Sequence, residues 1–226
     1  MLDKYASFAA LEACEVAGTD YSVNVVRREE SGVLIVAPHG GSIEIGTSEL
    51  GAHIAGTDYS LFTFDGHKAP GLNRDLHITS HNFDHPGCVT LAARHSIVLG
   101  VHGCKGESTQ VYVGGLDTDL TTLLTARLLE AGLPASAAGH KYPGRNPRNI
   151  CNRGARQRGA QLELSLDLRG PGTRALIASI VRGALADHLR RLDSDSAGVT
   201  ARPSEPAAPD TSRARPFSDS RSWGDR

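Results

Sequence analysis

Apolar and polar positions along the chain follow two alternating patterns. Short runs rich in β-branched or aromatic residues are typical of strands, whereas longer stretches with helical spacing of apolar residues are typical of helices. The strand-like runs are residues 21–26, 33–37, 59–64, 96–101, 110–113 and 161–168. The helix-like stretches are residues 5–16, 43–55, 86–95, 117–131 and 173–191. This order of elements predicts one α/β domain.

Two of the apolar runs end in the same way, in a histidine followed by glycine. The run at the start of VLIVAPHGG stops at Pro38-His39, because proline cannot donate to a strand ladder, and the run SIVLGV stops at His102. In open α/β sheets, ligands bind just beyond the carboxyl ends of the strands. Glu44 follows His39 on the same tight loop. We therefore expect His39, Glu44 and His102 to meet, and imidazole and carboxylate groups suit Zn²⁺.

The strand-like run QLELSLDL alternates strictly between leucine and polar residues. Its polar face carries Glu163 and Asp167. The long loop before it, residues 139–158, is rich in Arg, Asn, Gly and Pro, and residues 71–85 are polar enough to line a cleft. Asp117 stands where an N-cap is expected for the helix that follows it.

Composition excludes several classes of function. The chain of 226 residues has 24 basic and 25 acidic side chains and a formal net charge of −1, so no global field favours nucleic acid or a membrane surface. Its four cysteines are scattered, without a CxxC pair, which is typical of reduced thiols. No apolar run approaches twenty residues.

The amino-terminal segment lacks the basic and apolar regions of an export signal. We therefore expect a cytoplasmic protein, and the sequence leaves open whether lysis releases it to act on an external capsule. Residues 193–226 change to Ser, Pro, Ala, Asp and Arg with few large apolar side chains, which cannot offset the entropy of ordering. The expected organisation is a domain over residues 1–192 followed by a disordered tail over residues 193–226.

Several motifs, taken in order, resemble the poly-γ-glutamate hydrolase family of bacteria and their phages. They are APHGGSIE with GTSE, LHITS followed by FD, the strand ending in His102-Gly103, GGLD and QLELSLDLR, and they span about residues 5–190. The resemblance implies a zinc carboxypeptidase-like fold, a three-layer αβα sandwich with an open mixed sheet. It also implies one Zn²⁺ per chain held by His39, Glu44 and His102, with Glu163 as general base. The implied reaction is hydrolysis of γ-glutamyl amide bonds by metal-activated water.

The implied substrate, poly-γ-glutamate or a γ-glutamyl peptide, is anionic because each γ-linked residue keeps a free α-carboxylate. A cleft that binds it needs cationic or amide donors, and the arginine guanidinium suits carboxylates bidentately. The candidates are Arg153 and Asn152 in the long loop, with Arg74 and Lys105. The sequence leaves the oligomeric state open.

Each candidate residue also has a structural interpretation. A histidine after a strand is often a hydrogen-bonded loop residue, Glu44 could favour a helix N-terminus through its dipole, and Asp167 competes with Glu163. Arg153 could be a solvated loop residue. The group His77, His81, Asp84 and His85 could form a second metal site or line a polar cleft wall.

Two other functions share the expected fold. One is a related metallo-amidase or deacylase acting on small N-acyl amino acids or cell-wall peptides. The other is a non-catalytic binding module. A substrate panel separates the first from a polymer hydrolase, and turnover itself excludes the second.

Overall fold

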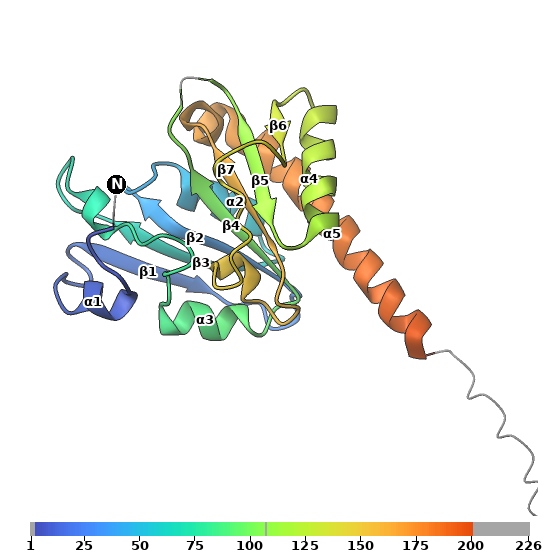
Figure 1. The fold of residues 1–226 in the computed structure, drawn as a ribbon, viewed down its shortest axis with the longest axis horizontal. Coiled ribbons are helices and arrows are strands. Elements are labelled where there is room, and N and C mark those ends of the chain that lie inside the picture. Colours follow the sequence, from blue (N-terminus) through green and yellow to red (C-terminus); the bar gives the residue numbers. More distant parts are fainter. Residues whose placement is uncertain (1–2, 107, 201–226) are drawn as a thin grey trace, which may run out of the picture.

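A computed structural model of the chain describes residues 3–106 and 108–200, and within them a seven-stranded mixed sheet (Figure 1). The strands are β1 (Tyr21–Val26), β2 (Val33–Gly41), β3 (Ser60–Gly66), β4 (Ile97–Gly103), β5 (Val111–Gly115), β6 (Ala135–Ser136) and β7 (Ala160–Leu164). Their order in the sheet is β1-β3-β2-β4-β7-β5-β6. Strands β3, β2, β4 and β7 run parallel, whereas β1 and β5 are antiparallel to their neighbours β3 and β7. The parallel strands therefore end together at one edge.

Helices cover both faces of this sheet. They are α1 (Phe8–Glu12), α2 (Thr47–Ala55), α3 (Pro86–Ala92), α4 (Thr118–Glu130) and α5 (Pro171–Thr200), with 3₁₀ turns η1 (Asn73–Leu76), η2 (Ile150–Asn152) and η3 (Leu166–Arg169). Alternate residues of β2 enter different cores. Val33 and Ile35 pack with apolar residues of α2, α4 and α5, whereas Leu34 and Val36 pack with those of α1 and α3. The structure is thus the three-layer α/β sandwich that was expected.

Strand β7 and helix α2 differ in their bounds from what the sequence pattern predicted. Strand β7 stops at Leu164, although the alternation of leucines continues to Leu168. Leu164 is the last residue of β7 that pairs with both β4 and β5. The amide of Ser165 still donates to the carbonyl of Gln110, and the chain then turns into η3. Helix α2 begins at Thr47 rather than near residue 43, and Glu44 therefore lies in the preceding turn.

Helix α5 extends further than the sequence pattern indicated. It runs to Thr200, eight residues past the expected domain boundary at residue 192. Adding a residue to an existing helix avoids the cost of nucleation, so a polar continuation is tolerated. The rest of the predicted tail, residues 201–226, lies outside the described residues.

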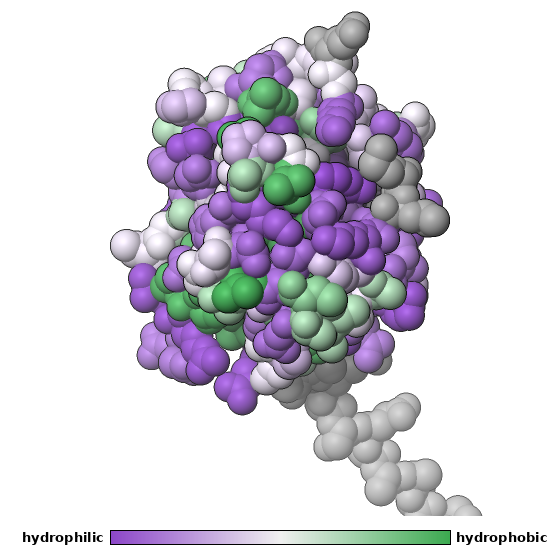
Figure 2. All heavy atoms as spheres, turned by 90° about the vertical axis from the view of Figure 1, so that its left-hand side faces the viewer, coloured by the Kyte–Doolittle hydropathy of each residue, from purple (hydrophilic) through white to green (hydrophobic). Residues whose placement is uncertain are grey.

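The surface matches the polar composition. Figure 2 shows the face at the left of Figure 1, where hydrophobic residues are scattered among hydrophilic ones. Among the described helices, none has the length and apolarity needed to cross a membrane. All four cysteines are unpaired, as the sequence predicted.

Candidate active site

A bulge in β2 brings His39 to the edge of the sheet. The register between β2 and β3 shifts between Ala37 and Gly40, so the intervening residues leave the regular ladder. The backbone then turns, and the amide of Glu44 donates to the carbonyl of His39 at 2.9 Å. The side chains of His39 and Glu44 are thereby held on one tight loop at the carboxyl end of β2.

Donor atoms of His39, Glu44 and His102 face one another. His39 Nδ1 lies 3.2 Å from Glu44 Oε1 and 3.2 Å from His102 Nδ1, and His102 Nδ1 lies 3.9 Å from Glu44 Oε2. Bonds of about 2.0–2.1 Å in a tetrahedral zinc centre would place donor atoms roughly 3.3 Å apart. The three side chains that the sequence expected to meet therefore lie at separations that suit one ion.

The outer hydrogen bonds of these side chains fix which atoms face inward. His39 Nε2 lies 2.8 Å from the carbonyl oxygen of Ile78, which can only accept, so Nε2 carries a proton and Nδ1 is the nitrogen that faces Glu44 and His102. The Nε2 of His102 lies 3.4 Å from Ser80 Oγ. Burial lowers the pKa of His39, but the charge of Glu44 outweighs it and raises the pKa, so without a metal a proton on His39 Nδ1 lies between the two groups. A divalent cation can replace that proton, and two imidazole nitrogens and a carboxylate then converge on it as lone-pair donors. The donor set therefore fits a divalent metal ion, with outer-sphere partners of the usual kind.

Burial and charge set the protonation of these groups. Burial lowers the pKa of His102, and the charge of His39 lowers it further, to about 3. Burial favours a higher pKa for Glu44, but the neighbouring His39 outweighs it and lowers the pKa to about 2. Near neutral pH, Glu44 is thus a carboxylate and His102 a neutral imidazole, the forms that bind metals.

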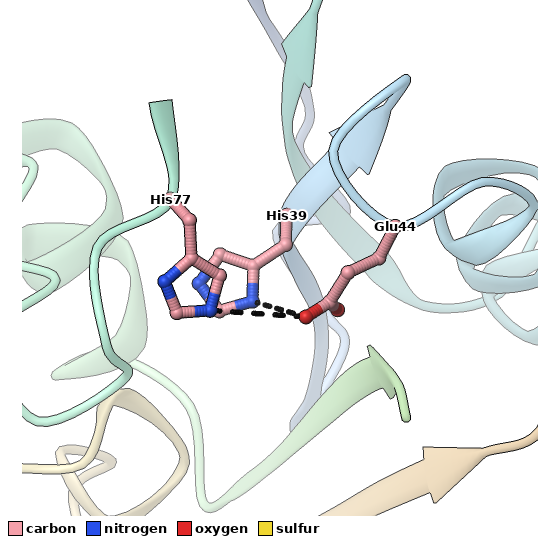
Figure 3. Close-up of side chains that lie close together, drawn as sticks. All are labelled: His39, Glu44 and His77. Carbon is pink, nitrogen blue, oxygen red and sulfur yellow. Dashed lines mark ion pairs between the residues drawn. The ribbon is translucent and has the colours of Figure 1, made fainter. Parts of the chain in front are cut away.

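A third histidine, His77, stands beside this group (Figure 3). Its ring stacks on that of His39 with centroids 4.0 Å apart, and its Nε2 lies 3.8 Å from Glu44 Oε1. On its other side, Nδ1 lies 2.8 Å from Asp3 Oδ1. His39, Glu44 and His77 have ligand atoms within 4.8 Å of one another, so His77 is a second candidate for the third ligand. The two candidates lie at similar distances from the Glu44 carboxylate, 3.8 Å for His77 and 3.9 Å for His102, and only for His102 does a ring nitrogen lie at hydrogen-bond distance from His39 Nδ1 in the contacts above.

Glu163 lies on the strand next to His102. The two residues are partners in the parallel pairing of β4 and β7, so their side chains lie on the same face of the sheet. Gln161 Nε2 donates to Glu163 Oε1 at 3.4 Å, and Asn149 in turn holds Gln161 Oε1 at 2.7 Å. Burial raises the pKa of Glu163 well above its usual value, and the charge of Glu44 adds to this. Such a carboxylate is a stronger proton acceptor than an exposed one.

Arg169 connects the loop of Glu44 to the strand of Glu163 through hydrogen bonds to two backbone carbonyls. Its Nη1 donates to the carbonyl of Ile45, and its Nε donates to the carbonyl of Leu164 at 3.1 Å. Each acceptor is the residue that directly follows one of the two glutamates. A Cβ on Gly103 would lie 2.5 Å from the guanidinium carbon, so a side chain there would displace the guanidinium of Arg169. Arg169 thus sets the spacing between the two acidic side chains.

Replacement of Arg169 by methionine is expected to lower the free energy of unfolding by about 2–5 kcal/mol, because each buried carbonyl left unpaired costs roughly 1–3 kcal/mol. Urea denaturation of the metal-free protein measures this loss. Arg190→Met is the control, since that arginine is exposed on α5 and should change stability by less than about 0.5 kcal/mol. Equal stability of the two variants would contradict the role of Arg169 as a connector.

The four expected substrate-binding residues lie on separate elements of the structure, and Arg153 precedes Gly154 and Ala155, which contact His95 before the start of β4. Arg74 is in η1, and its Nη2 lies 3.8 Å from Asp3, the partner of His77. Lys105 is exposed just beyond the end of β4, and Arg153 is half-buried at the end of η2. Asn152 differs from them because it is buried and its amide is fully engaged. It accepts from two backbone amides and donates to two carbonyls of its own loop, so no donor of this amide is left for a carboxylate.

Two further acidic residues, Asp167 and Asp117, accept hydrogen bonds from their surroundings. Asp167 lies on the exposed turn η3, where its carboxylate accepts from Ser165 and Thr109. Asp117 caps α4 through the amide of Leu120, as expected.

The residues weighed for a second metal site do not gather. His85 caps α3, and Asp84 accepts from the backbone of Phe8. Of this group only His77 lies in a cluster of potential metal ligands within the described part of the chain, and that cluster is the one with His39 and Glu44.

Comparison with known proteins gives this geometry a context. A family model described as poly-gamma-glutamate hydrolase matches residues 5–171. The chain belongs to this family. In Bacillus subtilis, the SPbeta prophage-derived protein YoqZ is 36% identical over 170 residues, and YndL is 37% identical over 169 residues. Each alignment covers 74% of this chain, but only 60% of YoqZ and 66% of YndL.

Two solved structures share the whole fold. A bacteriophage poly-gamma-glutamate hydrolase superposes with a TM-score of 0.79 at 31% identity, covering 83% of this chain and 99% of that one. A zinc-free apo form of YndL superposes with a TM-score of 0.72 at 33% identity, covering 84% and 98%. The three-layer α/β fold of this chain is thus shared with both of these structures over most of its length.

Several residues around the site were not expected from the sequence. His77 was considered only for a separate metal site, although the motif LHITS already contained it. Arg169 is the last letter of QLELSLDLR, and Gln161 is its first, but neither has a motif-like spacing to the histidines. Asp3 lies before the matched region and gave no signal.

Proposed function

We propose that this chain is a zinc-dependent hydrolase of γ-glutamyl amide bonds in poly-γ-glutamate. The observation that carries the proposal is the register of β4 and β7, which sets the carboxylate of Glu163 beside His102 and hence beside the converging acceptors. Membership of the poly-γ-glutamate hydrolase family supports the substrate, and the zinc-free YndL structure supports zinc as the metal.

In the proposed reaction, His39 Nδ1, Glu44 and His102 Nδ1 would hold one zinc ion. When bound, zinc would acidify a water molecule and polarise the scissile carbonyl. Glu163 accepts the proton of the attacking water and passes it to the leaving amine nitrogen. Gln161 holds one oxygen of Glu163, which leaves the other oxygen free for this transfer. Arg74, Lys105 and Arg153 remain the proposed partners of the α-carboxylates.

The test uses the purified full chain, dialysed against chelator and then titrated with zinc. One equivalent of zinc per chain should restore shortening of poly-γ-glutamate, followed by size-exclusion chromatography and by the release of new amino groups. Chelated protein should be slower by about 100-fold or more, since metal stabilisation of the transition state is worth several kcal/mol.

Poly-α-glutamate serves as the control, with equal charge but ordinary peptide bonds. Polymer that stays intact with zinc-loaded protein would refute the proposed function. Equal cleavage of both polymers would instead indicate a general peptidase, and cleavage of small N-acyl amino acids alone would indicate a deacylase.

A further inference from the structure

The line of side chains that contains His102 and Glu163 continues onto a third strand. Glu163 pairs with His102 on β4 and with Tyr112 on β5. Directly paired residues point to the same face of a sheet. The site therefore presents, in order across adjacent strands, a proposed metal ligand, the proposed base and a tyrosine. Tyr112 lies on the side of Glu163 away from the histidines.

Two further rings extend Tyr112 into an aromatic ledge, which we define as Tyr112, His140 and Tyr142. The Tyr112 ring centroid lies 5.1 Å from that of His140 and 5.5 Å from that of Tyr142, with interplanar angles of 34° and 38°. All three side chains are half-buried, so part of each stays open to solvent. His140 is fixed at both nitrogens, because Nε2 donates to the carbonyl of Val113 at 3.2 Å and Nδ1 accepts from the amide of Tyr142 at 3.2 Å.

The aromatic ledge is tied to the proposed base by a shared side chain. Gln161 Nε2, which donates to Glu163 Oε1, also donates to the carbonyl of Tyr142 at 3.3 Å. The next residue of the loop, Pro143, accepts from the amide of Gly115 at the end of β5 at 2.9 Å. The aromatic ledge is therefore held at a defined position relative to Glu163.

A cation stands at this ledge without a carboxylate partner. Lys141 is exposed, its Nζ lies 5.2 Å from the centroid of the Tyr142 ring, and it makes no ion pair with any acidic residue in the described part of the chain. A γ-glutamyl residue offers two methylene groups and one free α-carboxylate. The rings match the methylene groups and the lysine matches the carboxylate.

We propose that the aromatic ledge and Lys141 form the subsite for a γ-glutamyl residue that flanks the scissile bond on the β5 side. This inference rests on the proposed function, since it assumes that the bond is cleaved between Glu163 and the metal ligands. It assigns substrate recognition to residues on β5 and on the loop after β6, in addition to the arginines and Lys105 considered above.

The experiment measures steady-state kinetics on poly-γ-glutamate for Tyr142→Ala and Lys141→Ala. Each is expected to raise KM by about 5- to 10-fold, which corresponds to a loss of roughly 1 kcal/mol or slightly more, with kcat and zinc content unchanged. Tyr142→Phe and Lys141→Arg should keep the original KM because they preserve the ring and the charge. Arg191→Ala, an exposed cation on α5, is the control for a general loss of positive charge.

Binding provides a second arm that does not depend on turnover. Short γ-glutamyl oligomers are titrated calorimetrically into the zinc-loaded Glu163→Gln variant, with and without Tyr142→Ala. Lower affinity in the double variant supports the subsite. Unchanged KM and unchanged affinity would overturn the subsite while leaving the proposed function intact. If the unmodified protein neither cleaves the polymer nor binds the oligomers, the proposed function and the subsite both fail.

Discussion

Glu163→Gln is expected to lower kcat on poly-γ-glutamate by about 10²- to 10⁴-fold, the usual contribution of a positioned general base. Glutamine has nearly the same shape and can keep the contact with Gln161, but it cannot accept the proton of the attacking water. Because Glu163 is not among the proposed zinc ligands, the variant should retain one zinc per chain. Parallel measurement of kcat and of bound metal checks both statements.

Asp167→Asn is the matched control for this experiment. It removes the other carboxylate of the QLELSLDL motif, which lies on an exposed turn, and should leave kcat within about two-fold, as surface changes away from a site usually do. Full activity of Glu163→Gln would exclude Glu163 as the base. Loss of zinc from that variant would show instead that Glu163 contributes to metal binding.

His102→Ala is expected to abolish cleavage and to weaken zinc binding by more than about 100-fold, beyond the range seen for loss of an outer-sphere partner. It removes the nitrogen that lies 3.2 Å from His39 Nδ1. Zinc affinity is measured by competition with a chromophoric chelator, which reads the metal site without using activity.

His77→Ala is the comparison that decides between the two candidate ligand sets. If His77 is an outer-sphere neighbour of the metal rather than a ligand, the zinc affinity of this variant should fall by about 10- to 100-fold and no further. The opposite ranking, in which His77→Ala loses zinc and His102→Ala retains it, would assign the third ligand to His77. Both variants remove one buried or half-buried imidazole, so a general packing effect would weaken them similarly.

The expectations from sequence were strongest where local chemistry and the fold agree. The expected end of the first strand at Pro38 was wrong, because β2 bulges there and pairs with β3 again at Gly40 and Gly41. The sequence nevertheless placed His39 and His102 within the last residues of their strands. Their meeting followed from the parallel arrangement, because adjacent parallel strands end at one edge. The motif order added Glu163, although its strand proved shorter than the leucine alternation suggested.

The surroundings of the site could not be predicted in this way, since they depend on contacts between distant segments. Asp3 reaches His77 from the start of the chain, and Arg169 reaches Ile45 across more than a hundred residues. Asn152 is a residue for which the sequence suggested a role that the folded structure does not support. Its position in a polar, arginine-rich loop suggested a substrate contact, but folding surrounds its amide with backbone groups of that loop.

The sequence by itself determined the class of fold, the two strand ends that carry histidine and the carboxylate on the same loop, because these features depend on spacing along a few neighbouring residues. Only the tertiary structure decided which atoms face the metal position, that His77 stands beside it, and that Tyr112 continues the line beyond Glu163. These relations depend on strand order and register, and residues brought together by a sheet have no fixed separation in the chain.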